Sequence, residues 1–369
     1  MSILDAHREA LSLIAQRSRT RSLITRTGHD FASNDYLGLA NAPELRGAVA
    51  DALERGVAVG AGGSRLLRGN DPEHEALEAE AASFFHTEAA LYVSTGFAAN
   101  SAIFSALPAG RDLIVYDALI HASAHEGMRL GRATAIAARH NDVDSFADAI
   151  RDWRTAGGRG RAWIAVESLY SMDGDMAPLN ALAALAEREE AFLIVDEAHA
   201  TGVFGPDGRG LAADFDGREN VVTLRTCGKA LGCEGALVCC PRILAETLIN
   251  KARGFIYSTA PSPLSAAAVR ASLRLLRDQP ERRTRLRDLI AFAGTRLPTT
   301  GSQIVPVIIG EDARTMEVAA QLQARGFDVR GIRPPTVPTG TSRLRVSLTL
   351  NVGETTITAL ADAINELII

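Results

Sequence analysis

Residues 193–202 read LIVDEAHATG and place an acid three positions before a histidine. Asp196 ends an apolar run, and ligands bind at the carboxyl ends of such runs in open α/β sheets. The letters DEAH also occur in helicases, where the acid serves a magnesium and nucleotide site. Alternatively, Asp196 could keep the nitrogen of a pyridinium cofactor protonated, or it could cap a helix beside a structural His199. The four letters alone leave all three uses open.

A nucleotide motor also requires a phosphate loop of the form G-x-x-x-x-G-K-[ST]. The one Gly-Lys pair ends at Lys229, but Thr223 stands where the first glycine is required and Ala230 follows the lysine. The glycine-rich run GAGGSRLLRG (60–69) has no Gly-Lys pair, and Arg65 replaces the last glycine of a dinucleotide fingerprint. These departures argue against both kinds of nucleotide site.

Lys229 lies in LRTCGKALGCEGAL, after an apolar run and among small uncharged residues. A lysine in such a loop is expected to be partly desolvated, which lowers its pKa and leaves a nucleophilic amine. That amine can bond covalently to a carbonyl group. The chain has one other lysine, Lys251, and a surface lysine in a turn is the plain alternative for Lys229.

Other positions could contact a flat, phosphorylated cofactor. The stretch STGFAAN (94–100) should begin a helix whose first amides attract a phosphate, and Thr226 could add a hydroxyl. An ordinary helix cap is the alternative. His121 could stack on a planar ring, although a lone histidine is more often structural, and we interpret His125 and His140 in that structural way.

The elements that must position these residues alternate along the chain. Apolar runs predict strands at 112–117, 162–167, 191–197 and 221–226, and helical patterns lie between them, as at 145–156 and 178–190. Alternation with fully apolar strands predicts a mostly parallel sheet that is covered by helices on both faces.

The pattern changes from about residue 270, where a long Arg-rich helical stretch (270–297) begins. A strand, a helix, a second strand and a closing helix follow, at 303–309, 315–326, 343–350 and up to residue 369. We therefore expect an α/β protein with an N-terminal segment (1–40), a large domain (41–265) and a smaller α+β C-terminal domain (266–369).

Composition narrows the class of protein. The 369 residues carry a net charge of −5 with both signs mixed throughout, which is not typical of nucleic-acid-binding proteins. The four cysteines, at 227, 233, 239 and 240, lack metal-site and disulfide spacing, so we expect reduced thiols, no metal and a cytoplasmic setting. No apolar run reaches the roughly 18 residues that span a bilayer, so we expect no membrane contact. The first 22 residues predict an amphipathic helix rather than a targeting peptide.

Together these pieces resemble the α-oxoamine synthases, pyridoxal-phosphate enzymes of fold type I that join an amino acid to an acyl thioester. Nine stretches match in family order over nearly the whole chain. They are NDYLGLA (34–40), GAGGSRLLRG with PEHEALE (60–78), STGFAAN (94–100), DALIHASAHEG (117–127), SMDGDMAPL (171–179), VDEAHATGVFG (195–205), TCGKALG (226–232), FIYSTAPSP (255–263) and IRPPTVPTGTSRLRVSLT (332–349).

The resemblance implies roles in binding pyridoxal 5'-phosphate. Lys229 matches the lysine that bonds the cofactor, Asp196 the partner of the pyridine nitrogen, and His121 the residue that stacks on the ring and assists proton transfer. His199 would bond the phenolic oxygen. The remaining cofactor contacts would come from Gly96, Phe97, Ser171 and Thr226, and from Ser258 and Thr259 toward the phosphate of the neighbouring subunit in a homodimer.

On the substrate side, Arg345 matches the arginine that grips the amino-acid carboxylate, a task that suits a bidentate guanidinium. Asn34 and Thr336 match substrate positions, and Arg19 is our choice for the N-terminal substrate arginine, with Arg17 and Arg21 as alternatives.

The segments GGSRLLRG and PPTVPTGTSRLR are most similar to the biotin-pathway branch of the family, which condenses L-alanine with a pimeloyl thioester. The alternatives are a branch that uses glycine and acetyl-CoA, and a scaffold of the same fold that only binds ligands. One departure from the family is Glu234, where many relatives carry a small residue, and it puts the local geometry beside Lys229 in doubt.

Overall fold

The computed structural model describes residues 2–17 and 19–368. The chain forms two compact units, one made of residues 34–288 and the other of residues 1–33 together with 289–369. This division differs from the expected domain bounds, because the N-terminal 33 residues belong to the same unit as the C-terminal part, and because the large unit extends past residue 265.

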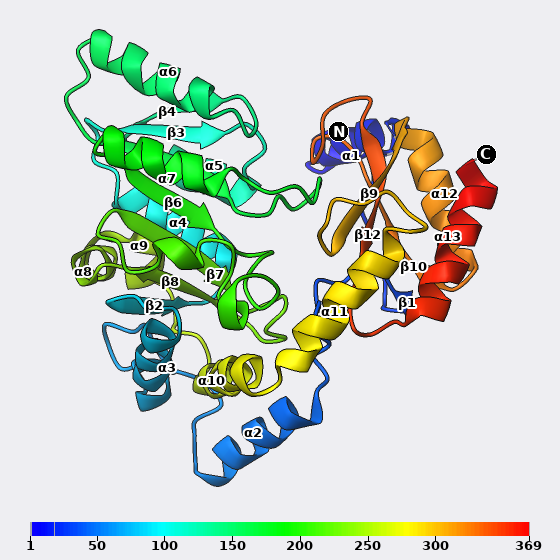
Figure 1. Cartoon of the computed structure of the whole chain (residues 1–369), viewed down its shortest axis with the longest axis horizontal. Coiled ribbons are helices and arrows are strands. Elements are labelled where there is room, and N and C mark those ends of the chain that lie inside the picture. Colours follow the sequence, from blue (N-terminus) through cyan, green and yellow to red (C-terminus); the bar gives the residue numbers. More distant parts are fainter. Residues whose placement is uncertain (1, 18, 369) are drawn as a thin grey trace. The chain divides into compact units, whose positions relative to one another are not determined.

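The large unit contains a seven-stranded sheet in the order β2-β8-β7-β6-β5-β3-β4 (Figure 1). Neighbours pair in parallel except at β8, which is antiparallel to both β2 and β7. The strands are β2 (Ala89–Val93), β3 (Leu113–Asp117), β4 (Thr134–Ala138), β5 (Ala162–Glu167), β6 (Phe192–Asp196), β7 (Val221–Thr226) and β8 (Ala236–Cys240). The predicted, mostly parallel sheet is confirmed.

Helices cover both faces of this sheet because nearly every strand position is apolar. Within β6, Ile194 packs into the core with helices α4, α5 and α8, whereas Leu193 and Val195 pack with α6 and α7 on the other face. The helices of this unit are α2 (Pro43–Glu54), α3 (Pro72–Phe84), α4 (Gly96–Ala106), α5 (Ala122–Leu130), α6 (Val143–Thr155), α7 (Leu179–Arg188), α8 (Arg242–Lys251), α9 (Arg253–Ile256) and α10 (Pro263–Asp278), with short 3-10 turns at Pro206–Gly208 and Ala213–Phe215.

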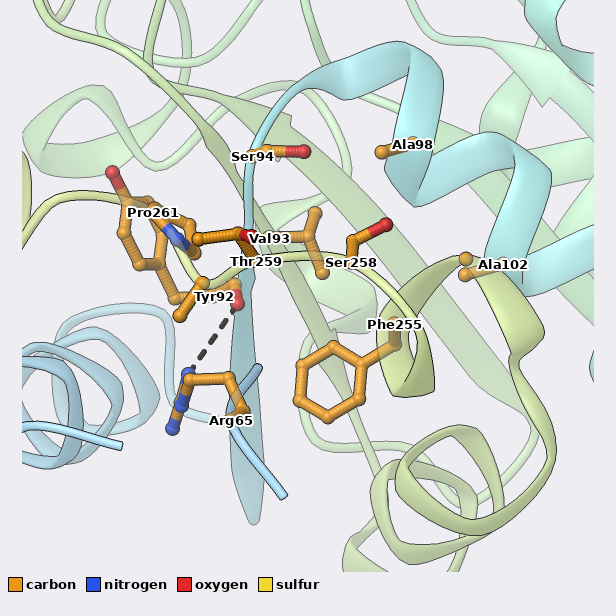
Figure 2. Close-up of a pocket in the computed structure, with 12 residues that line it drawn as sticks. Arg65, Tyr92, Val93, Ser94, Ala98, Ala102, Phe255, Ser258, Thr259 and Pro261 are labelled. Carbon is orange, nitrogen blue, oxygen red and sulfur yellow. Dashed lines mark hydrogen bonds between the residues drawn. The ribbon is translucent and has the colours of Figure 1, made fainter. Parts of the chain in front are cut away.

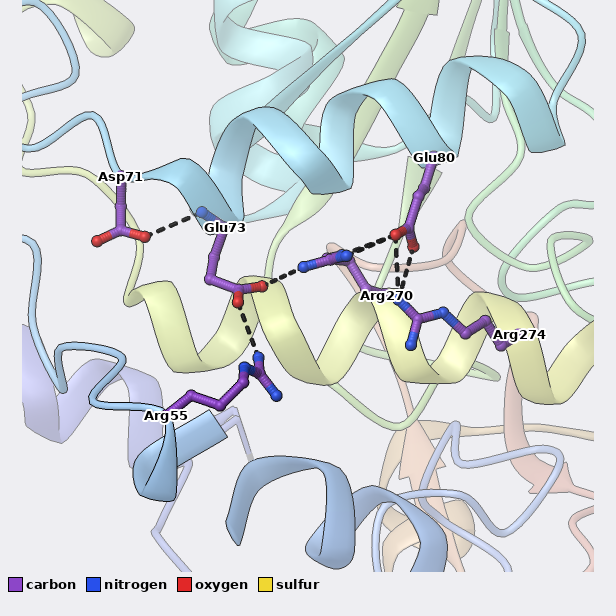
Figure 3. A network of polar contacts seen from close by, with 6 residues as sticks. All are labelled: Arg55, Asp71, Glu73, Glu80, Arg270 and Arg274. Carbon is purple, nitrogen blue, oxygen red and sulfur yellow. Dashed lines mark hydrogen bonds and ion pairs between the residues drawn. The ribbon is translucent and has the colours of Figure 1, made fainter. Parts of the chain in front are cut away.

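Helices α3 and α10 are joined by a chain of ion pairs that Figure 3 shows. Arg270 of α10 contacts Glu73 and Glu80 of α3, and Glu80 also pairs with Arg274 at 3.0 Å. Arg55, which follows α2, reaches the other oxygen of Glu73 at 2.9 Å. The network therefore links the end of α2 and helix α3 to α10, which lies 190 or more residues later in the sequence.

The second unit contains a three-stranded antiparallel sheet, β11-β12-β9, and a short parallel pair, β1-β10. Its elements are α1 (Asp5–Gln16), β1 (His29–Asp30), β9 (Ile304–Gly310), α12 (Asp312–Ala324), β10 (Phe327–Asp328), β11 (Arg330–Ile332), β12 (Ser342–Ser347) and α13 (Glu354–Ile368). The predicted Arg-rich helix at 270–297 is wrong as one element. It consists of α10 and α11 (Pro280–Ala293), because Pro280 cannot continue the preceding helix.

Candidate active site

Four neighbouring parallel strands end at the same edge of the large unit's sheet. Asp117, Glu167, Asp196 and Thr226 are the last residues of β3, β5, β6 and β7. Glu167 and Asp196 are direct register partners. Polar side chains at the ends of otherwise apolar strands mark this edge as a ligand site.

Asp196 is buried and held by two donors. The Asn100 side chain donates to one carboxylate oxygen at 2.8 Å, and the backbone N–H of Ala198 donates to the other at 3.0 Å. Donors on both oxygens hold the carboxylate in one orientation. A fixed, buried negative charge is what a cationic ring nitrogen needs as its partner.

His121 is linked to Asp196 through Asn100 and Ser123. The second hydrogen bond of the Asn100 amide goes to the Ser123 hydroxyl at 2.9 Å, and that hydroxyl lies 2.8 Å from Nδ1 of His121. The backbone N–H of Ser123 also donates to Nδ1 at 3.2 Å, so the proton of the neutral ring is on Nε2. Burial lowers the pKa of His121, the charge of Asp196 opposes this effect, and the positive charge of Lys229 adds to it, so that the pKa is lowered overall. The ring is therefore neutral at pH 7.

Glu167 is a site residue that the sequence analysis missed. Its carboxylate is fully buried and accepts the backbone N–H of Ser171 at 3.2 Å and a backbone hydrogen bond from His121. Burial raises the pKa of Glu167 well above its usual range, and the neighbouring Asp196 raises it further. A signal was present, because AWIAVE ends in an acid just as FLIVD does, on the next strand of the sheet.

Lys229 lies in the loop between β7 and β8, where Gly232 N–H donates to its carbonyl at 2.8 Å. Its positive charge lowers the pKa of both His121 and Glu167, which places the amine beside this polar cluster. The flanking Cys227 and Ala230 are buried, as the run of small residues predicted. The nearby Glu234 side chain is exposed, and its carbonyl accepts the Tyr92 hydroxyl at 2.9 Å, so Glu234 does not fill the loop.

His199 is buried and contacts a residue that the sequence analysis did not single out. The Tyr36 hydroxyl lies 2.7 Å from Nδ1 of His199, and it also bonds the Asn34 side-chain oxygen at 3.0 Å. Asn34, a predicted substrate residue, is thus tied to the loop that carries His199. Tyr36 lies within the matched stretch NDYLGLA, so only its contact was not predictable.

Helix α4 begins at Gly96, and its first turn forms a seat for an anion. The Thr95 hydroxyl accepts the N–H of Ala98 at 3.0 Å, which leaves the amides of Gly96 and Phe97 at the positive end of the helix without an intrahelical acceptor. A Cβ on Gly96 would lie 3.5 Å from the Thr226 hydroxyl oxygen. The structure therefore brings the predicted phosphate contacts Gly96, Phe97 and Thr226 together.

An open pocket adjoins this helix start, and Figure 2 shows its lining. Ser94, just before α4, and Ala98 in its first turn face Ser258 and Thr259, which follow α9, and Arg65 closes one side. Ser258 and Thr259 thus lie beside the anion seat of their own chain. Their expected contact with the phosphate of a neighbouring subunit remains a prediction.

The other predicted substrate residues belong to the second unit. Arg345, in β12, is buried and donates to the Ser347 hydroxyl at 2.8 Å. Arg19 pairs with Asp312 at 3.3 Å, and the N–H of Thr336 donates to the carbonyl of Arg333 at 3.1 Å. Their role toward the site in the large unit remains a prediction.

The residues of the large unit fit pyridoxal 5'-phosphate. A helix start with two open amides and a hydroxyl suits the phosphate, and the buried Asp196 suits the pyridine nitrogen. His121 and Lys229 lie beside them, so a stacking partner and an amine are present. Within residues 2–17 and 19–368 there is no cluster of three or more metal-binding side chains, and no helix is long and apolar enough to cross a membrane.

Comparison with known proteins agrees with this geometry. The chain is 44% identical to 8-amino-7-oxononanoate synthase of Anaeromyxobacter dehalogenans over 327 residues, which cover 86% of this chain and 81% of that protein. It is 43% identical to the same-named protein of Chromobacterium violaceum, with coverage of 90% and 87%.

Two solved structures share the fold of this chain. A serine palmitoyltransferase of Sphingomonas wittichii superposes with a TM-score of 0.87 at 26% identity, over 100% of this chain and 98% of that one. The 8-amino-7-oxononanoate synthase of Francisella tularensis superposes with a TM-score of 0.77 at 29% identity, over 92% and 97%. Residues 26–364 match the family described as aminotransferase class I and II. The chain belongs to the aminotransferase class I and II family.

Proposed function

We propose that the chain is a pyridoxal 5'-phosphate-dependent acyltransferase that catalyses the 8-amino-7-oxononanoate synthase reaction. This reaction condenses L-alanine with pimeloyl-CoA or a pimeloyl carrier protein, releases CO2 and belongs to biotin biosynthesis. The observation that carries the proposal is the buried Asp196, held by Asn100 and surrounded by His121 and Lys229 at the edge of the sheet. Relatives named for this reaction, at 44% identity over 86% of the chain, support it.

When bound, the cofactor supplies an electron sink for the bonds to the α-carbon of the amino acid. Asp196 would keep the ring nitrogen protonated, because Asn100 and Ala198 hold its carboxylate in place. The Lys229 amine would remove the α-proton and later return one. The Nε2–H of His121 would donate a hydrogen bond toward the reacting carbonyl, since its Nδ1 is already engaged by Ser123.

Arg345 would bind the carboxylate of L-alanine, with Asn34 and Thr336 near the substrate. Arg19 would bind the far end of the acyl donor. These assignments come from matched motifs, and the first test is the substitution Arg345→Lys. It retains the charge but removes the bidentate fork, so the KM for alanine should rise at least tenfold.

A panel of acyl thioesters with alanine, glycine and serine, scored by CO2 release, tests the reaction. We expect the pimeloyl donor with alanine to give the highest kcat/KM. A preference for acetyl-CoA with glycine would instead assign the chain to glycine C-acetyltransferase. If no acyl donor supports CO2 release, the chain is a binding scaffold of the same fold.

Lys229→Ala tests the cofactor assignment separately, with Lys251→Ala as the matched control on the chain's other lysine. The purified Lys229→Ala protein should lose the visible absorption of the bound cofactor and all turnover, whereas Lys251→Ala should retain both. A Lys229→Ala protein that keeps the same spectrum and turns over would refute the assignment.

We also propose that the enzyme is a cytoplasmic homodimer. The four cysteines are unpaired thiols in the structure, which fits a reducing compartment. Light scattering of the purified protein should give twice the mass of 39.2 kDa.

A further inference from the structure

His140 and its two carboxylate partners, Asp117 and Asp175, lie outside the site described above, and we interpreted His140 from the sequence as a structural residue. The residue follows β4, in the turn before α6. Its Nδ1 lies 2.8 Å from Asp117 and its Nε2 lies 2.8 Å from Asp175. Both ring nitrogens can donate only in the imidazolium form, so this geometry requires a protonated ring.

Asp117 organises the segment that leads to His121. Its carboxylate is completely buried and accepts the N–H groups of Leu119 and Asn141, each at 2.8 Å. Its carbonyl accepts the N–H of Ile120 at 3.0 Å. Residues 118–120, between the end of β3 and His121, are therefore held in place by hydrogen bonds to Asp117.

Asp175 organises the segment that carries Ser171. Its carbonyl accepts the N–H of Tyr170 at 2.9 Å, and Leu169 and Met176 form a bridge that closes the turn. The Asn141 amide donates to the same Asp175 oxygen that contacts His140, at 2.7 Å. The loop of residues 168–177 is thus tied to His140 and to the residue beside it.

The same two segments meet again at the cofactor side, where Glu167 accepts the backbone of both Ser171 and His121. The segments are consequently held together at two points. Glu167 lies at the cofactor end and His140 at the far end, with Tyr170 packed edge-on against the His140 ring at 4.5 Å.

We propose that His140 is a positioning residue for catalysis: its imidazolium bridges Asp117 and Asp175 and thereby fixes the two loops that present His121 and Ser171 to the cofactor. The inference rests on the proposed function for its activity readout only. We assign His140 no contact with the cofactor or the substrate.

The surroundings of His140 set the sign of a pH effect. The charged or titratable groups that face the ring are Asp117 from β3, and Asp175 and Tyr170 from the loop after β5. The adjacent Arg139 points its guanidinium away, to Asp142 at 2.7 Å. Burial alone would lower the pKa of His140, but its hydrogen bonds to the two carboxylates raise it overall. The bridge is therefore complete at pH 6 and is lost as pH rises through the raised pKa.

The experiment compares His140→Gln with His125→Gln in the holoenzyme. His125 is the matched control, because it is also partly buried against a tyrosine, Tyr116 at 5.1 Å, but it has no carboxylate bridge. Small displacements of a catalytic group cost up to about 100-fold, so we expect His140→Gln to lower kcat by about 10- to 100-fold with the KM for alanine changed less than threefold. His125→Gln should stay within threefold of the wild type.

Two readouts separate positioning from a merely structural role. The ratio of wild-type to His140→Gln kcat should fall at least threefold between pH 6 and pH 9.5, because the wild type loses the bridge as well. The pH midpoint of the cofactor's visible absorption should also shift in His140→Gln and not in His125→Gln. A ratio that is constant with pH, or an unshifted absorption midpoint, would overturn the proposal.

A second variant keeps the test open if His140→Gln does not fold. Asp175→Asn removes one end of the bridge at a side chain that is 39% exposed, and it should show the same shift in the absorption midpoint. A wild-type spectrum in Asp175→Asn would contradict the proposal. If the wild type turns over none of the thioesters, the proposed function fails, but the absorption readout still decides the role of His140.

Discussion

Removing the guanidinium of Arg225 should cost more stability than removing any exposed arginine of this protein. Arg225 is fully buried in β7, one residue before Thr226. One of its nitrogens lies 2.6 Å from Asp216, another lies 3.4 Å from Glu197, and the guanidinium stacks 4.2 Å from the Phe85 ring. Both carboxylates are also buried.

Arg225→Met keeps most of the volume but leaves the buried Glu197 without its cation and leaves Asp216 with Arg209 at 3.5 Å. Breaking a buried ion pair in this way costs about 3–5 kcal/mol of unfolding free energy. Arg161→Met is the control, because Arg161 pairs with Glu190 at 2.7 Å on the surface, with side chains 57% and 80% exposed. Exposed pairs of this kind contribute at most about 1 kcal/mol. Urea unfolding followed by circular dichroism measures both losses.

The loss in Arg225→Met should depend on pH in a definite direction. Burial already raises the pKa of Glu197 to about 7 and raises that of Asp216, while Arg225 lowers both. Without Arg225 both pKa values rise further, so the folded protein binds protons that the unfolded chain has released. The variant should therefore regain stability as pH falls from 8 to 5, and Glu197→Gln in the Arg225→Met background should recover part of the loss at pH 8. A deficit below about 1 kcal/mol at pH 8, or one that is equal at both pH values, would refute this reasoning.

Three further predictions follow from the described contacts. Asn100→Ala removes a hydrogen-bond donor from both Asp196 and Ser123. An orphaned buried partner costs roughly 1–3 kcal/mol, so kcat should fall about tenfold. The control Asn220→Ala loses only a hydrogen bond to the Ala191 carbonyl and should not change kcat. Gly210→Ala places a methyl group 1.5 Å from a Glu197 oxygen at a residue whose φ is +102°. The free energy of unfolding, measured in urea, should therefore fall by more than about 2 kcal/mol. Gly47→Ala lies inside α2 with open space around it, and it should raise the free energy of unfolding by about 0.5–1 kcal/mol. Arg270→Met should lower the unfolding free energy by about 1–2 kcal/mol at low salt and by less in 1 M NaCl. Salt screens the ion pairs that Arg270 forms with Glu73 and Glu80, because these pairs are partly exposed. A loss of stability that does not change with salt would contradict this electrostatic account.

The features of this fold that could be predicted are those that depend on the residues of a single strand. The runs at 162–167 and 221–226 became β5 and β7 with those bounds, because every position of these strands is buried and neither strand has a solvent-facing register to choose. The antiparallel β8 was not predicted, since ALVCC is as apolar as its parallel neighbours. The contributions of Asn100, Glu167 and Tyr36 were missed for a related reason. Each lies in or beside a recognised stretch, but its partner is on another element, and one sequence does not report such distances.

The two neighbouring acids in the stretch DEAH, at the end of β6, have different partners. Side chains alternate at the end of β6, so Asp196 faces Asn100 at the cofactor site, whereas the next residue, Glu197, faces the buried Arg225. The same alternation on β7 puts Thr226 at the site and Arg225 beneath it. The two acids consequently lie in different surroundings, because Asp196 has two hydrogen-bond donors, whereas Glu197 shares a cation with Asp216 and has a pKa raised to about 7. Exchanging the two letters would leave a carboxylate at both positions, but each would be displaced by about one methylene from the donors or the cation that it faces. The length of the side chain at each position, and not only the presence of an acid, therefore makes Asp196 fit to serve a pyridinium nitrogen.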